Sequence, residues 1–157
     1  MALTPTPEQQ MQNIFLKMAQ YLSRNMKLEL TYLGMECTNM ARDRGWEESW
    51  RDRTGNLRSS IGFAYFQEGV KIVESAFGQV GADPTGSTTG KNFIDELAKE
   101  LSSTYALVVV AGMEYAEYVE TKRDVLASAE LYARGRIDET VQRAINSTIA
   151  MINREFR

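Results

Sequence analysis

One apolar stripe of helical period constrains the fold of this chain more than any other feature. Apolar residues recur at every third or fourth position from Met11 to Met40, which places their side chains on one face of an α-helix. A capping-box pattern at Thr6-Pro7-Glu8-Gln9 precedes them, so a long N-terminal helix is expected over about residues 7–44. The stripe consists of Met11, Phe15, Met18, Leu22, Met26, Leu30, Leu33, Cys37 and Met40.

This helix is longer than the core of one small domain requires. The chain has 157 residues, a length typical of a single domain, here 1–157. About 30 helical residues make a rod of roughly 45 Å, so part of the stripe is expected to face another subunit. Gly34 interrupts the stripe and is a candidate for a kink or a break, since glycine costs about 1 kcal/mol relative to alanine in a helix.

The middle of the chain carries strand patterns. A polar, arginine-rich connector over residues 45–60 is expected to be solvated. It leads to two predicted strands, Ile61 to Phe66 and Val70 to Phe77, joined by a turn that contains Gly69. Alternation along the first strand would put Ile61, Phe63 and Tyr65 on one face of the sheet.

A loop, a short helix and a third strand follow. Residues 78–90 are rich in glycine, serine and threonine, which predicts a flexible loop. Asn92 is then expected to cap a short helix. The run Ala106 to Ala111 is apolar and largely β-branched, which is typical of a central strand covered on both faces.

Helical spacing returns near the C-terminus and completes the fold prediction. A C-terminal helix is expected over about residues 125–157, with Gly135 separating a first short turn from the main helix. The class is therefore α+β, with long N-terminal and C-terminal helices packed on a small, mainly antiparallel sheet. The apolar residues of the last helix are Ile137, Val141, Ile145, Ile149, Ile152 and Phe156.

The composition excludes several classes of function. There is no histidine, so neither a Ser-His-Asp triad nor a His-ligated metal site can form. The net charge is −3, which provides no global attraction for nucleic acid. The N-terminus lacks the basic and apolar regions of a signal peptide, and no apolar run is long enough to span a membrane. We expect no catalytic residue, cofactor or metal, and synthesis in the cytoplasm.

Three local patterns have a functional and a plain interpretation. Gly86 to Asn92 resembles a phosphate loop, but its glycine spacing does not fit, and a plain loop is favoured. Glu114, Glu117, Glu120 and Asp124 could supply acid-base or cation-binding carboxylates, but a solvated edge is the favoured interpretation. Trp46 and Trp50 lie among arginines and acids, which favours surface ion pairs or a subunit contact over nucleic-acid binding. Cys37 is expected to be a small buried hydrophobe.

Two segments together suggest a family. Residues 53–61 read RTGNLRSSI and residues 110–120 read VAGMEYAEYVE. They resemble segments of the head-tail joining proteins of long-tailed bacteriophages, in which a Thr-Gly-x-Leu-Arg-x-Ser-Ile segment follows an N-terminal helix and a Gly-x-x-Tyr-Ala-x-Tyr-Val-Glu segment follows a strand. Many members continue with an aromatic residue and Gly-Thr, whereas Thr121-Lys122-Arg123-Asp124 stands here.

The resemblance implies a structural protein of the virion neck without enzymatic activity. Such a protein, made in the host cytoplasm, would form a homo-oligomeric ring around the DNA channel. Its partners would be portal or head-closure proteins and tail-terminator or tail-tube proteins, and DNA would pass through without sequence-specific binding. No membrane is implied. The alternative is a small cytosolic enzyme or ligand-binding protein that uses the Glu114 to Asp124 carboxylates or the Gly90-Lys91 loop. Candidate partner contacts are Gly81, Asp83, Gly86, Gly90, Trp46, Trp50, Tyr115, Tyr118 and Glu120.

Overall fold

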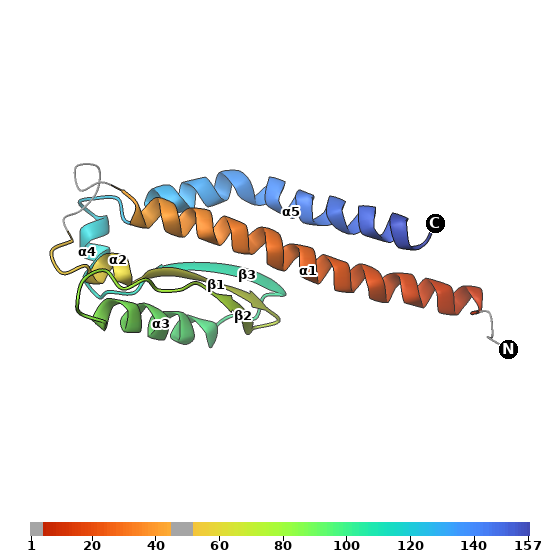
Figure 1. Ribbon diagram of the computed structural model, residues 1–157, viewed down its shortest axis with the longest axis horizontal. Helices are drawn as coiled ribbons and strands as arrows, with labels where there is room; N and C mark the ends of the chain where they lie inside the picture. The colour runs from red at the N-terminus through yellow and green to blue at the C-terminus, as the bar shows by residue number, and fades with distance from the viewer. Residues whose placement is uncertain (1–4, 45–51) are drawn as a thin grey trace.

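The computed structural model describes residues 5–44 and 52–157, in which two long helices run antiparallel beside a three-stranded sheet (Figure 1). Helix α1 spans Pro7–Arg42 and helix α5 spans Ala127–Glu155. The sheet has the order β2-β1-β3, and both pairings are antiparallel. Its strands are β1 at Ile61–Gln67, β2 at Val70–Glu74 and β3 at Tyr105–Ala111. The predicted α+β class with long terminal helices is confirmed.

Helices cover both faces of the sheet. The antiparallel pair α1 and α5 lies on one side, and α3, which spans Thr85–Ala98, lies on the other (Figure 1). The short helices α2, at Asn56–Ser59, and α4, at Ala116–Glu120, lie at the end of the molecule away from both chain termini (Figure 1). Alternate side chains of β1 therefore enter two different cores.

Strand β1 is the centre of the fold. Tyr65 packs with Met26 and Leu30 of α1 and with Ala144 of α5, whereas Ala64 and Phe66 pack with Ile94 of α3. The first six residues of β1 are all buried. Ile61 and Tyr65 both lie in clusters on the α1 side, and Phe63 touches Gly34 of α1, so the three residues share one face as the alternation predicts.

Helix α1 confirms the predicted N-terminus and divides the apolar stripe in two. The Thr6 hydroxyl accepts a hydrogen bond from the Gln9 N–H at 3.3 Å, and the Gln9 side chain accepts one from the Thr6 N–H at 2.9 Å. Members of the stripe from Met26 to Cys37 are buried, whereas Met11, Phe15 and Met18 are exposed. The N-terminal part of α1 extends past both the sheet and the end of α5 (Figure 1).

Gly34 does not interrupt α1, which is continuous from Pro7 to Arg42. A methyl group at this position would lie 2.5 Å from Cδ2 of Phe63 and 2.8 Å from Cδ1 of Leu107. Glycine here lets the helix approach the sheet closely, so the residue has a packing role and is not a helix breaker.

The hairpin is shorter than the prediction. Glu68 and Gly69 both have positive φ, at 51° and 75°, as a two-residue turn of type I′ requires. Strand β2 ends at Glu74 and not at Phe77. Beyond it, the Ser75 hydroxyl accepts a hydrogen bond from the Phe63 N–H at 2.9 Å, and Phe77 turns into the core between the sheet and α3.

Strand β3 was expected in the centre of the sheet, and this prediction is wrong. It forms one edge, and β1 takes the central place. Of its residues only Val110 is fully buried, and the other six are half-buried. The apolar, β-branched composition of residues 106–111 predicts a strand covered on both faces, and side chains of β3 do pack on both sides of the sheet. Only the central place in the sheet is wrong, because β3 has a single neighbouring strand.

The predicted glycine-rich loop is partly helical. Helix α3 begins at Thr85, well before the predicted start at Asn92, and only residues 75–84 form a loop. Asp83 stabilises the new start, because its carboxylate accepts hydrogen bonds from the Thr85 N–H at 2.9 Å and from the Thr85 hydroxyl at 2.6 Å. The low intrinsic helix propensity of Gly86 and Gly90 is overridden by tertiary packing.

Helix α5 differs from the prediction in two ways. It runs without a break through Gly135. Its buried residues are Ala129, Thr140, Ala144 and Thr148 and not the predicted isoleucine stripe. Small side chains let α1 and α5 approach closely, and the buried Asn25 amide donates to the Thr148 hydroxyl at 3.0 Å. Three apolar residues of the predicted stripe, Ile145, Ile149 and Phe156, are exposed instead.

Candidate functional site

The two segments that carry the family resemblance lie side by side in space. Residues 53–61 lead into β1 and residues 110–120 lead out of β3, and Ile61 pairs with Ala111 in the sheet. One step further, the Gly112 N–H donates to the Ser60 carbonyl at 3.1 Å. We call these two segments, together with residues 83–90, the motif junction. Residues 83 and 84 precede α3, and residues 85–90 form its first part.

Glycines in α3 close the motif junction. A methyl group on Gly86 would lie 2.2 Å from the Asn56 carbonyl oxygen, and one on Gly90 would lie 2.6 Å from that of Ser60. One on Gly112 would lie 2.6 Å from the Gly90 Cα. Gly86 and Gly90 are therefore buried. Both were predicted as partner contacts in a mobile loop, and in this fold they are internal packing positions.

The first segment is anchored by a carboxylate and a guanidinium. Asp52 accepts hydrogen bonds from the Gly55 N–H at 3.0 Å and the Arg58 N–H at 2.9 Å. The Arg58 guanidinium donates to the carbonyls of Arg42, at 2.8 Å, and Arg44, at 2.6 Å. These bonds satisfy carbonyls at the C-terminal end of α1. Residues 55–60 are buried apart from the half-buried Arg58, so this part of the predicted connector belongs to the folded core and is not solvated.

Asp83 links this segment to α3. Besides its bonds to Thr85, its carboxylate accepts a hydrogen bond from the Asn56 side-chain amide at 3.0 Å. The Thr85 hydroxyl and then the Asn56 amide hold the pKa of Asp83 below its usual value. Gly81 is exposed and has a φ of 88°. Asp83 and Gly81 remain accessible to a partner, unlike Gly86 and Gly90.

The predicted carboxylates divide into structural and exposed groups. Glu120 accepts hydrogen bonds from the N–H groups of Val125, Leu126 and Ala127 at 2.9, 2.7 and 3.0 Å. It therefore caps the start of α5. Asp124 accepts a hydrogen bond from the Ser128 N–H at 3.1 Å and forms an ion pair with Arg44. Burial raises the pKa of Asp124, but Ser128 and Arg44 outweigh it and leave the pKa lowered.

An open cavity of about 730 Å³ lies beside these carboxylates, between α3, α4 and the start of α5. Glu114 and Glu117 are exposed at its rim. Among the described residues, no group of three or more His, Cys, Asp or Glu side chains is placed to hold a metal ion. The carboxylates that line the cavity are Glu96, Glu114, Glu117, Glu120 and Glu130.

Two tyrosines give the motif junction an aromatic outer surface. Tyr115 and Tyr118 are exposed at 42% and 63%, and Lys122 Nζ lies 4.2 Å from the centre of the Tyr118 ring. Exposed tyrosines are enriched at protein interfaces because they offer a large apolar area with a polar tip. Trp46 and Trp50, the other aromatic candidates, lie outside the described residues.

A second exposed surface was only partly anticipated by the sequence. Phe15 and Leu16 of α1 are exposed at 61% and 63%. Leu16 lines a shallow pocket together with Phe156, which directly follows α5. The excess length of the N-terminal stripe pointed to α1, but the contribution of α5 depends on which of its faces packs against α1. We define the helix-end surface as Met11, Phe15, Leu16, Met18, Ile149 and Phe156.

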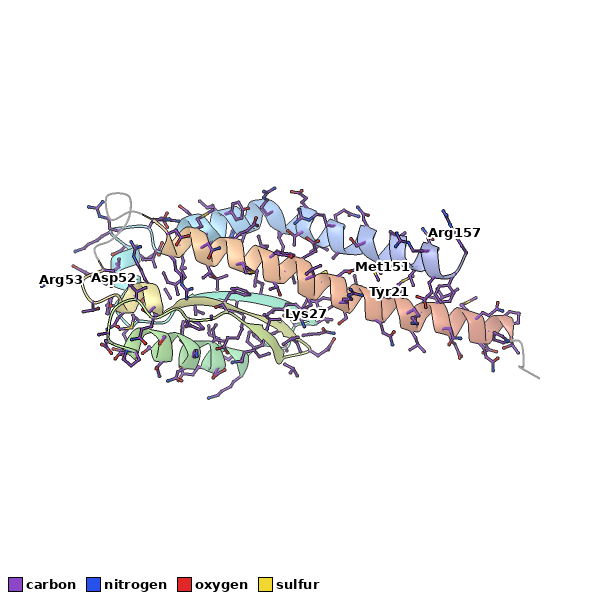
Figure 2. All side chains as sticks on the ribbon, in the orientation of Figure 1. Tyr21, Lys27, Asp52, Arg53, Met151 and Arg157 are labelled. Carbon is purple, nitrogen blue, oxygen red and sulfur yellow. The ribbon has the colours of Figure 1, made fainter. Side chains whose placement is uncertain are left out.

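The two surfaces lie at opposite ends of the molecule. Asp52 and Arg53 mark the end with the motif junction, and Arg157 marks the end with the helix-end surface (Figure 2). Between them, Tyr21 of α1 lies close to the C-terminal part of α5 (Figure 2), where its hydroxyl hydrogen-bonds the Glu155 carboxylate. Lys17 pairs with the same carboxylate at 3.2 Å. These contacts join the C-terminal end of α5 to residues 17–21 of α1.

Comparison with protein-family models, with curated proteins and with solved structures gave no match. The helices in residues 5–44 and 52–157 include none with both the length and the apolar character of a membrane span.

Proposed function

We propose that this chain is a structural subunit of a tailed-phage neck, forming a homo-oligomeric ring that joins the head or portal to the tail around the DNA channel. The resemblance of residues 53–61 and 110–120 to head-tail joining proteins carries the proposal. The adjacency of these segments supports it, because the Gly112 to Ser60 hydrogen bond makes them parts of one substructure. Two unrelated chance matches would not be expected to meet in space.

The distribution of exposed apolar side chains supports an assembled state. A monomer has no need for Phe15 and Leu16 to lie uncovered on a projecting helix, and clustered exposed apolar residues mark interaction sites. The motif junction, with Tyr115 and Tyr118, lies at the other end of the molecule. Different surfaces at opposite ends suit contacts between successive rings along the neck, whereas a closed ring needs a repeated head-to-tail contact between neighbours.

The charge suits a channel through which DNA passes. The net charge is −3, so the subunit offers no general attraction for phosphate groups. A strongly basic wall would hold DNA with an affinity that rises with each neutralised phosphate. On this proposal the protein is made in the host cytoplasm, becomes part of the virion and has no enzymatic activity.

The proposal is tested by assembly. The mass of the full chain is measured by light scattering over a concentration series, alone and after mixing with purified portal complexes or tail tubes. A ring, or binding to either complex, is the expected result. A chain that remains monomeric and binds neither complex would contradict the proposal.

A matched pair of variants adds specificity to this test. Phe15→Asp places a charge in the helix-end surface and is expected to weaken assembly without unfolding the protein, because Phe15 is exposed. Gln12→Asp places the same charge on an exposed position of the same helix and is expected to assemble as the original chain does. Equal assembly by the two variants would exclude the helix-end surface as a contact.

The acidic cavity supports one rival function, a small ligand-binding protein or enzyme. Five glutamates line it, and such a site would favour a cationic ligand. Thermal unfolding with Mg²⁺ or Ca²⁺ tests this rival, because a cation bound to the folded state raises the unfolding temperature. A shift that disappears in Glu117→Gln but persists in Glu8→Gln, a change on exposed α1, would favour the rival.

A further inference from the structure

Strand β3 has an open edge. The hydrogen-bond ladder with β1 continues past both ends of β3, through the Gly112 to Ser60 bond at one end and the Glu68 to Thr104 bond at the other. Along a strand of an antiparallel pair, the backbone N–H and C=O groups of successive residues point alternately toward the partner strand and away from it. In β3 the backbone groups of Ala106, Val108 and Val110 point toward β1. Those of Tyr105, Leu107, Val109 and Ala111 point away from the sheet. No described residue forms a hydrogen bond with these outward groups.

Natural sheets usually protect such edges, and the other edge of this sheet is protected. Strand β2 carries a register shift opposite Tyr65 and Phe66. Its Lys71 is ion-paired with Glu74 and with Asp95 of α3. Bulges and charged side chains are the common devices that prevent an edge from pairing with another strand. Strand β3 has neither: its seven residues include no charge and no proline, and its pairing with β1 has no shift.

We propose that β3 pairs antiparallel with β3 of a second copy of this chain, across a two-fold axis. An open edge requires an extended strand as its partner. Among the described strands the only other edge is β2, which is protected, so the complementary strand is β3 itself. A two-fold contact brings the same patch of both copies together, and the apolar side chains of the two strands then form cross-strand pairs.

This pairing accounts for the missing edge protection of the strand. In the dimer the sheet has the order β2-β1-β3-β3-β1-β2, with both protected edges outside and both open edges inside. Residues 106–111 then lie in a strand with a neighbour on each side. Such a strand needs neither a bulge nor a charge to prevent further pairing, and β3 has neither.

The dimer goes beyond the proposed function and does not depend on it. A closed ring repeats one head-to-tail contact between two different surfaces of the subunit, whereas the β3 pair joins the same surface of two copies across a two-fold axis. The two contacts are therefore different, and the dimer is a state of the free protein.

Amide hydrogen exchange on the full chain tests the pairing directly. In dilute solution the amides of Leu107 and Val109 are expected to exchange fast, and those of Val108 and Val110 slowly, because only the latter are bonded to β1. At concentrations where sedimentation shows the mass of two chains, all four are expected to be slow. A dimer in which Leu107 and Val109 still exchange fast would overturn the inference, as would a chain that is monomeric throughout.

Edge variants provide the control. Val109→Pro removes an outward N–H that β1 does not use, and proline is tolerated at such edge positions. It is expected to lose the dimer and keep the circular dichroism of the original chain. Ile72→Lys, at an exposed position of β2, is expected to dimerise normally. Loss of the dimer in Ile72→Lys alone would assign the contact to β2 and overturn the inference.

The same data separate this inference from the proposed function. Should Val109→Pro fail to fold, the amide exchange pattern of the original chain still decides between the presence and the absence of the β3 pair. A ring on portal complexes without any β3 dimer in free solution would overturn the inference and leave the neck proposal intact. A β3 dimer that binds no portal or tail complex would support the inference and contradict the neck proposal.

Discussion

Gly112 lies against Gly90 so closely that a methyl group on Gly112 would be 2.6 Å from the Gly90 Cα and 2.9 Å from its backbone nitrogen. This contact joins the end of β3 to the middle of α3. Gly90 also lies against the Ser60 carbonyl. Residues 53–61, residues 110–120 and α3 therefore all meet at Gly90. The motif junction therefore depends on two positions without side chains.

Gly112→Ala is expected to lower the free energy of unfolding by about 1–3 kcal/mol, the usual cost of overpacking a close-packed site. The atoms that the new methyl group would meet belong to the backbone of α3 and cannot rotate away. Urea unfolding followed by circular dichroism measures the change. An unchanged midpoint would show that α3 can shift without cost and that the junction is loose.

Gly135→Ala is the matched control, for which the free energy of unfolding is expected to rise and not to fall. Gly135 lies inside α5, and a methyl group there would meet nothing within 4 Å. Alanine is favoured over glycine in a helix interior by about 0.5–1 kcal/mol, so this variant is expected to be stabilised by that amount. The same urea titration measures it. Destabilisation would indicate that α5 is bent or broken at this position in solution.

Glu120→Ala is expected to destabilise the chain by about 0.5–2 kcal/mol, the range found when a helix N-terminal cap is lost. Its carboxylate accepts hydrogen bonds from three successive N–H groups at the start of α5, and these donors would lose their partner. Glu117→Ala, at an exposed neighbour in α4, is expected to change stability by less than about 0.5 kcal/mol. Thermal unfolding compares the two, and similar losses would contradict the capping role.

The stability of the motif junction is expected to fall in acid partly through Asp83. Its hydrogen bonds to Thr85 and Asn56 lower its pKa in the folded state. The stabilisation is therefore complete above the unfolded-state pKa of about 3.9 and is lost as the pH falls through the lower, folded-state pKa. Urea unfolding at about pH 6 and about pH 3 should show a smaller acid loss in Asp83→Asn than in the original chain. An equal loss would mean that other carboxylates dominate.

The Cys37 thiol is expected to be nearly inert in the folded protein. It is 1% exposed, and burial raises its pKa, so little of the reactive thiolate forms near neutral pH. A thiol reagent such as dithiobisnitrobenzoate should react slowly with the native chain and rapidly in urea. Fast native reaction would indicate frequent opening between α1 and α5, because the thiol lies within hydrogen-bonding distance of the Ala129 carbonyl.

Local signals determined α1 and the hairpin. The N-terminus of α1 follows from the capping box of Thr6 and Gln9, whose bonds join residues three apart. The turn at Glu68 and Gly69 likewise depends on the conformational preference of adjacent residues. The stripe from Met26 to Cys37 becomes buried as predicted because its period is a property of the helix alone.

Contacts between distant residues decided what local signals could not. The sequence from Thr85 to Gly90 has a poor helix propensity, yet it is helical because Gly86 and Gly90 fit against Asn56 and Ser60. The isoleucines of α5 have the right period, but Thr140, Ala144 and Thr148 face α1 instead, since small side chains allow the closer approach.

By itself the sequence determined the α+β class, the long terminal helices and the two segments of the motif junction. Each of these depends on periodicity or on residues close in the chain, so short-range physics is sufficient for them. Only the tertiary structure decided that β3 is an edge, that Glu120 caps α5 and that Gly112 meets Gly90. Those facts depend on which surfaces fit together at van der Waals distance, and close packing of residues far apart in the chain leaves little trace in local composition.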